Sequence, residues 1–295
     1  MIVIFPTNGL QNVIEKEYRQ ELYATESLKI EHLLFDFDSF VDGDIKKAFR
    51  NIKKQYSEQK AIYRGWMMST DQYETFFIEL LKYNIILINS PFEYDRAHCL
   101  YTAYDIIKDY TPFSTFILEE DFNDESLEKA LEPFHGKSVF FRDFYKSEKF
   151  LWETASFIPD GSDIKKVKEI INGFKEFRSI KRGYVFREFI TLSRIGKHPL
   201  SNIPISNEWR IYFLNNKVID IFPYWEDGNY VGVQKPSLDK FIDIGKKIDS
   251  SFFTMDIAKT DKGQWIIIEL GDGQVSSLMR DCDHERFYRK LGRDL

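Results

Sequence analysis

Cysteine is scarce in this sequence, and long apolar runs are missing. Cys99 and Cys282 are its two cysteines, so no disulfide framework is expected to hold the fold together. No apolar run approaches the roughly 20 residues that a membrane-spanning helix requires. The apolar start, Met1–Phe5, stops at Pro6 and lacks a basic leader, so it does not resemble a signal peptide. We therefore expect a cytoplasmic protein with no membrane partner.

An excess of basic charge and two common nucleotide-binding motifs are also lacking. The 41 basic and 47 acidic side chains give a net charge of −6, which does not favour binding along nucleic-acid phosphates. Neither a Walker phosphate loop nor a dinucleotide glycine fingerprint occurs. At 295 residues the chain is longer than one core usually serves, so we expect two or three packed units. The sequence does not indicate the oligomeric state.

The first ninety residues alternate short apolar runs with charged amphipathic stretches. This alternation predicts a parallel sheet with crossover helices, whose ligands bind where the strands end. The expected strands are Ile2–Phe5, His32–Phe37, Ala61–Arg64 and Ile85–Asn89. The expected helices are Val13–Thr25, Ile45–Ser57 and Asp71–Tyr83.

The rest of the chain mixes helices with antiparallel hairpin signals. Asn215-Asn216 separates two apolar runs and suits the positive φ of a tight turn. The expected strands are Val139–Arg142, Tyr184–Ile190, Trp209–Leu214, Val218–Phe222, Phe252–Ala258 and Gln264–Leu270. The expected helices are Tyr94–Asp109, Asp163–Phe177 and Asp283–Leu291.

Two acidic residues lie on the last of these hairpins. If its turn has an even number of loop residues, Asp256 faces Ile267, and Glu269 is a diagonal neighbour on the same face. Such neighbours lie about 7–8 Å apart, a spacing suited to shared bound ions. The opposite face then belongs to the core and carries Phe253, Met255, Ile257, Ile266, Ile268 and Leu270.

This acidic face predicts a magnesium site. Carboxylates on a rigid hairpin are oxygen ligands of the kind that magnesium selects, and Asp272 is a third acid close by. The alternative is a hairpin whose acidic face is only solvated. Asp and Glu are depleted in strands, which weakens that alternative.

The hairpin resembles the magnesium-binding hairpin of the ATP-grasp superfamily, in which an Asp on one strand precedes a Glu-x-Asn on the next. The surrounding segments resemble one clade of stand-alone bacterial and phage proteins, named for a conserved arginine and two lysines. The matching pieces occur in the family's order and span most of the chain. They are RGWMM from Arg64, SVFFRDFYKS from Ser138, VFREF from Val185, EWRIYF from Glu208 and IIIELGDGQVS from Ile266.

The resemblance implies a mixed α/β and α+β protein with the ATP-grasp fold. In this fold a parallel α/β domain, here residues 1–93, precedes two α+β subdomains that clasp ATP. The small subdomain corresponds to residues 94–190. The large subdomain corresponds to residues 191–295 and carries the metal hairpin.

The resemblance also implies an ATP site. Arg142 stands where the family has a strand-borne Lys that contacts phosphates, and Lys146 follows in the next loop. Arginine keeps the charge but offers a planar fork; the alternative is a cation at the surface end of a strand. Glu188, Phe189 and Ile190 correspond to the hinge that binds adenine, although Glu188 is also consistent with an exposed strand acid.

For catalysis, the resemblance implies that Arg210 contacts the transferred phosphate, where a fixed guanidinium stabilises developing charge. The alternative is that Arg210 forms an ion pair with Glu208 or another acid. Asp256 and Glu269 are implied as metal ligands. The family's Asn is Gly271 here, so Asp272 is a weaker substitute.

The expected activity is that of a carboxylate–amine ligase that uses ATP and Mg²⁺ and passes through an acylphosphate. Its partners would be a small-molecule or peptide carboxylate and an amine. Arg64, Arg182 and Arg187 are speculative carboxylate-binding residues, since arginine suits bidentate recognition. Two alternatives remain. One is an inert nucleotide-binding module, suggested by Arg142 and Gly271. The other is a phosphotransferase with a non-carboxylate acceptor.

Overall fold

Four apolar runs of the N-terminal third pair as parallel strands in the computed structural model, which describes residues 1–8, 13–147, 151–199 and 204–294. Their order is β3-β1-β4-β5, and all four predicted strands are confirmed. Short β2 (Val13–Ile14) pairs antiparallel with the end of β1. The four strands are β1 (Ile2–Asn8), β3 (Glu31–Asp36), β4 (Gln59–Tyr63) and β5 (Ile85–Leu87).

The helices of this N-terminal sheet are shorter than the sequence predicts. The first, α1 (Arg19–Ser27), starts late because Val13–Ile14 is used as a strand. The second, α3 (Ile45–Ala48), ends after one turn, and Phe49 and Ile52 then enter the core. The unit also contains α2 (Phe37–Val41) and α4 (Thr70–Leu81), the latter with a capping box at Ser69.

A second, antiparallel sheet is built from the middle of the chain and is called the small sheet here. Its order is β6-β9-β7-β8. Its strands are β6 (Ser114–Leu118), β7 (Val139–Asp143), β8 (Phe157–Ile158) and β9 (Gly183–Glu188). The apolar faces of α7 (Asp124–Leu131) and α9 (Ile164–Phe177) form one core with this sheet, as the helical spacing of residues 164–174 predicts. The one-turn helix α8 (Trp152–Ala155) precedes β8.

The large sheet, also antiparallel, has the order β13-β12-β14-β15. Asn215 and Asn216, both with positive φ, form the predicted turn between β12 and β13. The strands are β12 (Glu208–Leu214), β13 (Lys217–Pro223), β14 (Phe252–Lys259) and β15 (Trp265–Asp272). Two short strands, β10 (Arg194–Lys197) and β11 (Pro204–Ser206), pair separately in the connection from the small sheet.

Helices from distant parts of the sequence cover the large sheet. The predicted helix 94–109 is two helices, α5 (Pro91–His98) and α6 (Leu100–Ile107), because Cys99 is extended. Residues of α6 share one core with the large sheet and with α10 (Asp239–Gly245), not with the small sheet. The terminal helix α11 (His284–Asp294) packs with strands of the N-terminal and large sheets. A division by packing therefore joins α6 to the large sheet.

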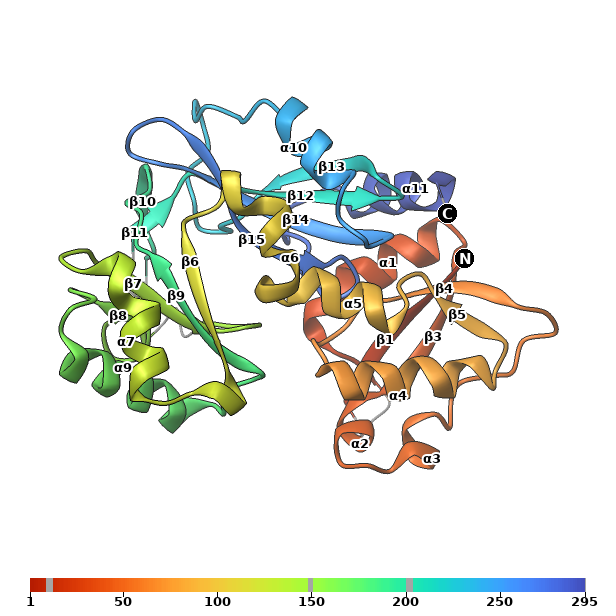
Figure 1. Cartoon of the computed structure of the whole chain (residues 1–295). Coiled ribbons are helices and arrows are strands. Elements are labelled where there is room, and N and C mark those ends of the chain that lie inside the picture. The colour runs from red at the N-terminus through yellow and green to blue at the C-terminus, as the bar shows by residue number, and fades with distance from the viewer. Residues whose placement is uncertain (9–12, 148–150, 200–203, 295) are drawn as a thin grey trace.

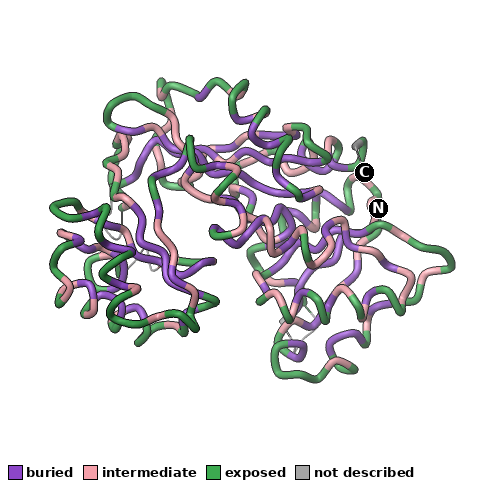
Figure 2. The backbone as a smooth tube through the Cα atoms, in the orientation of Figure 1, coloured by how far each residue is buried: buried purple, intermediate pink, exposed green. Residues whose placement is uncertain are grey.

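The three units are arranged with the large sheet above the other two in the view of Figure 1. Buried backbone runs through the strands of all three sheets, and the exposed backbone lies mainly in outer helices and loops (Figure 2). Among the described residues, no helix is both long and apolar enough to cross a bilayer.

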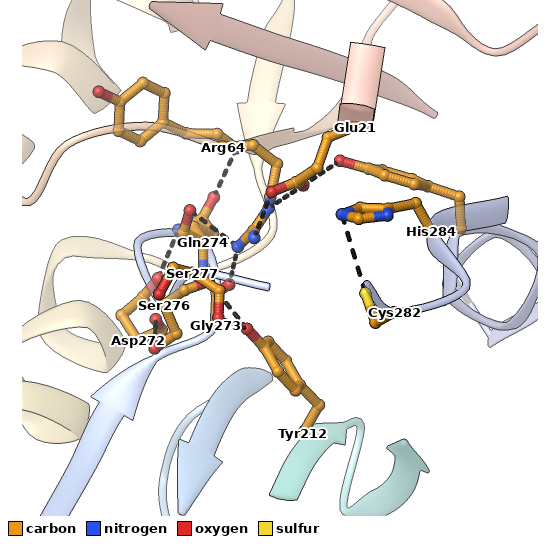
Figure 3. Close-up of polar contacts among 12 residues, drawn as sticks. Glu21, Arg64, Tyr212, Asp272, Gly273, Gln274, Ser276, Ser277, Cys282 and His284 are labelled. Carbon is orange, nitrogen blue, oxygen red and sulfur yellow. Dashed lines mark hydrogen bonds and ion pairs between the residues drawn. The ribbon is translucent and has the colours of Figure 1, made fainter. Parts of the chain in front are cut away.

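A buried ion pair joins the N-terminal unit to the end of β15. Arg64 has no exposed surface and makes two hydrogen bonds to Glu21 of α1, at 2.7 and 3.0 Å. Its guanidinium also donates to the backbone carbonyls of Gly273 and Gln274 (Figure 3). Tyr288 of α11 donates to the same Glu21 carboxylate at 2.6 Å. Because removing one partner of a buried pair leaves an uncompensated charge, these contacts fix where the strand β15 ends.

Candidate active site

Three charged side chains form a row across one face of the large sheet. Arg210 of β12 is paired with Asp256 of β14, and Asp256 is paired in turn with Glu269 of β15. Because side chains alternate along a strand, this row shares a face with Tyr212 and Thr254, and the core residues point the other way. We call Arg210, Asp256 and Glu269 the charge row.

The register of the metal hairpin differs from the prediction. Asp256 lies directly opposite Glu269, not opposite Ile267, because the pairing shifts between Asp256 and Ile257. A bulge of this kind adds one residue to one strand. It changes which isoleucine enters the core: Ile267 is fully buried, whereas Ile266 and Ile268 are only partly buried. The two acids are therefore direct neighbours and not diagonal ones.

Asp256 is held by Arg210 through a bidentate ion pair. The Nε–Oδ1 and NH2–Oδ2 distances are 2.7 and 2.8 Å, and a third donor reaches the carbonyl of Ser277 at 3.3 Å. The guanidinium also stacks over the ring of Tyr224, 5.0 Å from its centroid. Burial acts to lower the pKa of Arg210, but Asp256 outweighs it and the pKa lies well above its ordinary value. The expected alternative partner, Glu208, does not fill this role.

Glu269 is held by an arginine from the other sheet. Arg142 of β7 forms an ion pair with Glu269 at 3.1 Å, and its guanidinium also donates to the carbonyls of Asp143 and Tyr145. Arg142 is buried, so it is not the strand-end surface cation of the alternative interpretation. Two adjacent carboxylates are thus balanced by two arginines that come from different sheets.

A cavity of about 200 Å³ opens between the small and large sheets beside this pair, and we call it the hinge cavity. Five residues predicted for ATP or metal binding line it: Arg142, Glu188, Phe189, Ile190 and Glu269. The side chain of Glu188 has no ion-pair partner among the described residues. Sequence reasoning did not identify the other lining residues, which include Pro112, Phe140, Ser147, Leu192 and Ile268. Their apolar character gave no signal, because core strands have the same composition.

The cavity is suited to an anionic ligand with an apolar part. Arg142 and Arg187 both line it, and the buried Nε of Arg187 has no acceptor among the described residues. Burial, together with the nearby charge of Arg142, lowers the pKa of Arg187 to about 9, although Glu269 opposes this shift. Phosphate oxygens would supply the missing acceptors.

The acidic pair fits magnesium, but no larger metal cluster is present. Among the described residues, no group of three or more His, Cys, Asp or Glu side chains is arranged to hold an ion. Magnesium commonly uses one or two carboxylates and completes its shell with water and substrate phosphates. Asp256 and Glu269 supply such a pair, because both present carboxylate oxygens on one face at neighbouring positions.

Asp272 does not join this pair. It has no exposed surface, and its alternation along β15 puts it on the opposite face from Glu269. Asn89 donates to its carboxylate, as does the backbone N–H of Gln274 at 2.8 Å. Burial raises the pKa of Asp272 to about 7, although these hydrogen bonds oppose the shift. Figure 3 shows Asp272 with Gln274 in the polar cluster at the end of β15.

The three arginines expected to hold a substrate have different surroundings. Arg64 is occupied by Glu21 and by backbone carbonyls, as described above. Arg182 lines a second cavity together with Lys146, which was predicted for ATP binding. Arg187 holds the backbone of β15. None of these partners is near in sequence, so the spacing of the residues could not reveal them.

Arg187 and Thr111 together clamp the bulge that aligns Glu269 with Asp256. Arg187 donates to the carbonyl of Ile268 at 2.7 Å and to that of Ile267 at 3.1 Å. Thr111 donates to the same Ile267 carbonyl at 2.7 Å, and Arg187 also donates to the Thr111 hydroxyl. These contacts lie between the core residue Ile267 and the charged residue Glu269. They hold β15 in the register that brings the two acids together.

Comparison with a known family covers more than half of the chain. The sequence profile of a family described as an ATP-grasp domain, family 3 of its clade, matches residues 132–291. This range contains the charge row, Arg142 and the hinge residues. No curated protein is significantly similar in sequence.

Solved structures share the fold over nearly the whole chain. A D-cycloserine synthetase is 13% identical, with a TM-score of 0.60 and 99% of each chain covered. A D-alanine–D-alanine ligase from Bacillus anthracis is 12% identical, with a TM-score of 0.56 and 99% and 96% covered. A RimK-domain ATP-grasp protein from Sphaerobacter thermophilus is 9% identical, with a TM-score of 0.56 and 94% and 92% covered. At these identities the similarity concerns the fold.

The clamp generates a testable prediction about metal binding. Arg187→Lys replaces the two-carbonyl fork with a single ammonium, so the bulge should lose its fixed position and Glu269 its alignment. We expect Mn²⁺ affinity, measured by electron paramagnetic resonance with a non-hydrolysable ATP analogue present, to fall about ten- to a hundredfold, the usual effect of losing a supporting contact. The control Ile268→Val keeps the clamped carbonyl and should bind Mn²⁺ normally. Wild-type Mn²⁺ affinity in Arg187→Lys would show that the clamp does not position the acids.

Proposed function

This chain belongs to the ATP-grasp domain family whose profile it matches, family 3 of its clade, and from that premise we propose that it is a magnesium-dependent ligase that uses ATP to join a carboxylate to an amine. One observation carries the proposal. Two carboxylates from adjacent strands of the large sheet stand side by side, each neutralised by an arginine, at the wall of the hinge cavity. Like charges directly opposite one another on a sheet are destabilising, so a pair of this kind needs a cation.

ATP is proposed to occupy the hinge cavity. The extended backbone after β9 and the apolar walls suit a purine, which needs a flat slot and an exposed backbone edge. Glu188 would accept a hydrogen bond from the exocyclic amine of adenine. Arg142 and Arg187 would face the phosphates.

Magnesium held by Asp256 and Glu269 would neutralise charge on the phosphate oxygens. Arg210 and Arg142 already contact these two acids, so their guanidinium groups lie within the same region of charge. We propose that Arg210 stabilises the negative charge that develops on the transferred phosphoryl group, as a preorganised donor does at a polar site.

The proposed reaction has two steps. A carboxylate oxygen of the first substrate bonds to the γ-phosphorus as the bond to ADP breaks, which gives an acylphosphate and ADP. The nitrogen of the second substrate then bonds to the acyl carbon and loses a proton, and phosphate leaves with the electron pair of the C–O bond. The products are an amide, ADP and phosphate.

The comparisons are compatible with this chemistry. The relatives in fold include proteins described as a ligase and a synthetase. The alternatives are an inert nucleotide-binding module and a phosphotransferase with another acceptor. The retained pair of Asp256 and Glu269 favours catalysis over the inert module, because a module that only binds ATP has no need of catalytic metals. We also propose that residues 1–93, 94–190 and 191–295 correspond to the pre-ATP-grasp domain and the two subdomains, with the packing of α6 as noted.

The first test removes the charged ligand oxygens. Asp256→Asn and Glu269→Gln each delete a negative charge without adding bulk, so we expect magnesium-dependent ADP formation to be lost while the protein stays folded. The measurement is ADP release with pooled amino acids and short peptides, together with the melting temperature. The control Asp243→Asn makes the same change at an exposed helical position and should retain activity. Full turnover in both variants would remove the proposed metal site.

A second test concerns Arg210, which has both a catalytic and a structural interpretation. Arg210→Lys keeps the charge but loses the fork. If Arg210 acts in the transition state, turnover should fall roughly a hundred- to thousandfold, the typical effect of removing one aimed donor, while ATP affinity changes little. If it serves only as the partner of Asp256, the melting temperature should fall and the folded protein should remain active. Measuring both quantities on one preparation decides between these accounts.

A further inference from the structure

A second cavity of about 490 Å³ lies between the N-terminal unit and the loops of the small sheet. Three segments and one isolated side chain form it. They are residues 67–71 before and at the start of α4, residues 143–146 after β7, residues 178–182 between α9 and β9, and Tyr94 of α5. This volume falls within the usual range of about 300–1,000 Å³ for small-ligand sites. We call it the basic cavity.

Its charge is predominantly positive. The lining cations are Lys146, Arg178, Lys181 and Arg182, and the lining acids are Asp71 and Asp143. Asp143 turns its carboxylate into its own loop, where it accepts the backbone N–H groups of Tyr145 and Lys146 at 2.7 and 2.6 Å. Lys181 is exposed and has no ion-pair partner among the described residues.

One wall of the basic cavity is fixed by a network around Asp95. Arg182 donates to both carboxylate oxygens of Asp95 at 3.0 Å and to the hydroxyl of Tyr145 at 2.8 Å. Tyr145 and Thr70 also donate to Asp95, at 2.6 and 3.1 Å. Arg182 has a φ of +63°, a conformation that non-glycine residues keep only where their surroundings fix it. The network joins both sides of the cavity, so the charge of Arg182 is used internally and the ligand would be held chiefly by the other cations.

The remaining wall is apolar. Met67 and Met68 line it, and Tyr94 and Tyr145 contribute ring surface. A carboxylate on a short aliphatic stem matches this division, because its stem would contact the methionines while its charge faced the cationic loop 178–182. The flexible, polarisable side chain of methionine adapts well to such stems.

The basic cavity is also a neighbour of the hinge cavity. Both are lined by the end of β7 and its loop: Arg142 and Ser147 line the hinge cavity, and Asp143, Tyr145 and Lys146 line the basic cavity. Different residues of one short segment thus serve the two sites. A ligand in the basic cavity would lie on the other side of this segment from the proposed phosphates.

From this geometry we infer that the basic cavity binds the carboxylate substrate, and that this substrate is a dicarboxylate: an acidic amino acid, or a short peptide with an acidic side chain. One carboxylate is the reacting group, and the second is held by Lys181 and Arg178. The inference rests on the proposed ligase function, which it makes more specific. The cavity and its charge are observed independently of that function.

The test uses three dipeptides of matched backbone, Glu-Glu, Gln-Gln and Lys-Lys, with the full chain and a non-hydrolysable ATP analogue. Calorimetric titration should give Glu-Glu the highest affinity. Lys181→Glu should weaken Glu-Glu binding roughly ten- to a hundredfold, as expected for loss of a charged hydrogen bond, without changing the affinity for the ATP analogue. The matched control Lys165→Glu makes the same charge change on an exposed part of α9 outside the cavity, and should leave Glu-Glu binding unchanged.

Two outcomes would overturn the inference. One is equal affinity for the three dipeptides, or no binding of any of them. The other is normal Glu-Glu binding by Lys181→Glu. A separate assay of ADP release distinguishes failure of this inference from failure of the ligase proposal. Selective Glu-Glu binding without ADP release supports the acidic site and contradicts the ligase, whereas ADP release stimulated equally by Gln-Gln and Glu-Glu supports the ligase and contradicts the acidic site.

Discussion

Two carboxylates that share one face of a sheet at neighbouring positions repel each other, and the arrangement of this protein depends on how that repulsion is balanced. Arg210 reaches Asp256 from the adjacent strand, and Arg142 reaches Glu269 from the small sheet. The second contact crosses from one sheet to the other, so the acidic pair also sets how the two sheets meet. The hinge cavity is formed where they do. Charge balance and the shape of the site therefore have one origin.

The balance requires a particular register, and the register requires support from outside the hairpin. A one-residue bulge brings Glu269 opposite Asp256, and the donors of Arg187 and Thr111 hold the carbonyls at the bulge. At the end of the same strand, Arg64 and Asn89 of the N-terminal unit hold residues 272–274. Contacts from all three units thus converge on β15. Moving any one of them would displace the charged side chain that β15 presents to the cavity.

The sequence predicted the parts of this structure that depend on local patterning. Alternating apolar residues located the strands, and the Asn215-Asn216 turn was identified because few residues tolerate positive φ. The hairpin register was missed because Ile266, Ile267 and Ile268 are chemically alike, so no pattern shows which one enters the core. Arg64 and Asp272 were assigned to the site because a charged residue near a motif suggests function. Their burial depends on partners such as Glu21 and Asn89 that are remote in sequence, and only the tertiary structure brings these together.

The central claim is that the acidic pair and its two arginines form a site for magnesium and the phosphates of ATP. A crystal structure with Mn²⁺ and a non-hydrolysable ATP analogue tests it most directly, because the anomalous signal of manganese locates the ion. The account predicts manganese bound to both Asp256 and Glu269, the purine in the hinge cavity beside Glu188, and Arg210 and Arg142 turned towards phosphate oxygens. A nucleotide in the hinge cavity with manganese away from both carboxylates, or a nucleotide bound elsewhere on the protein, would contradict it.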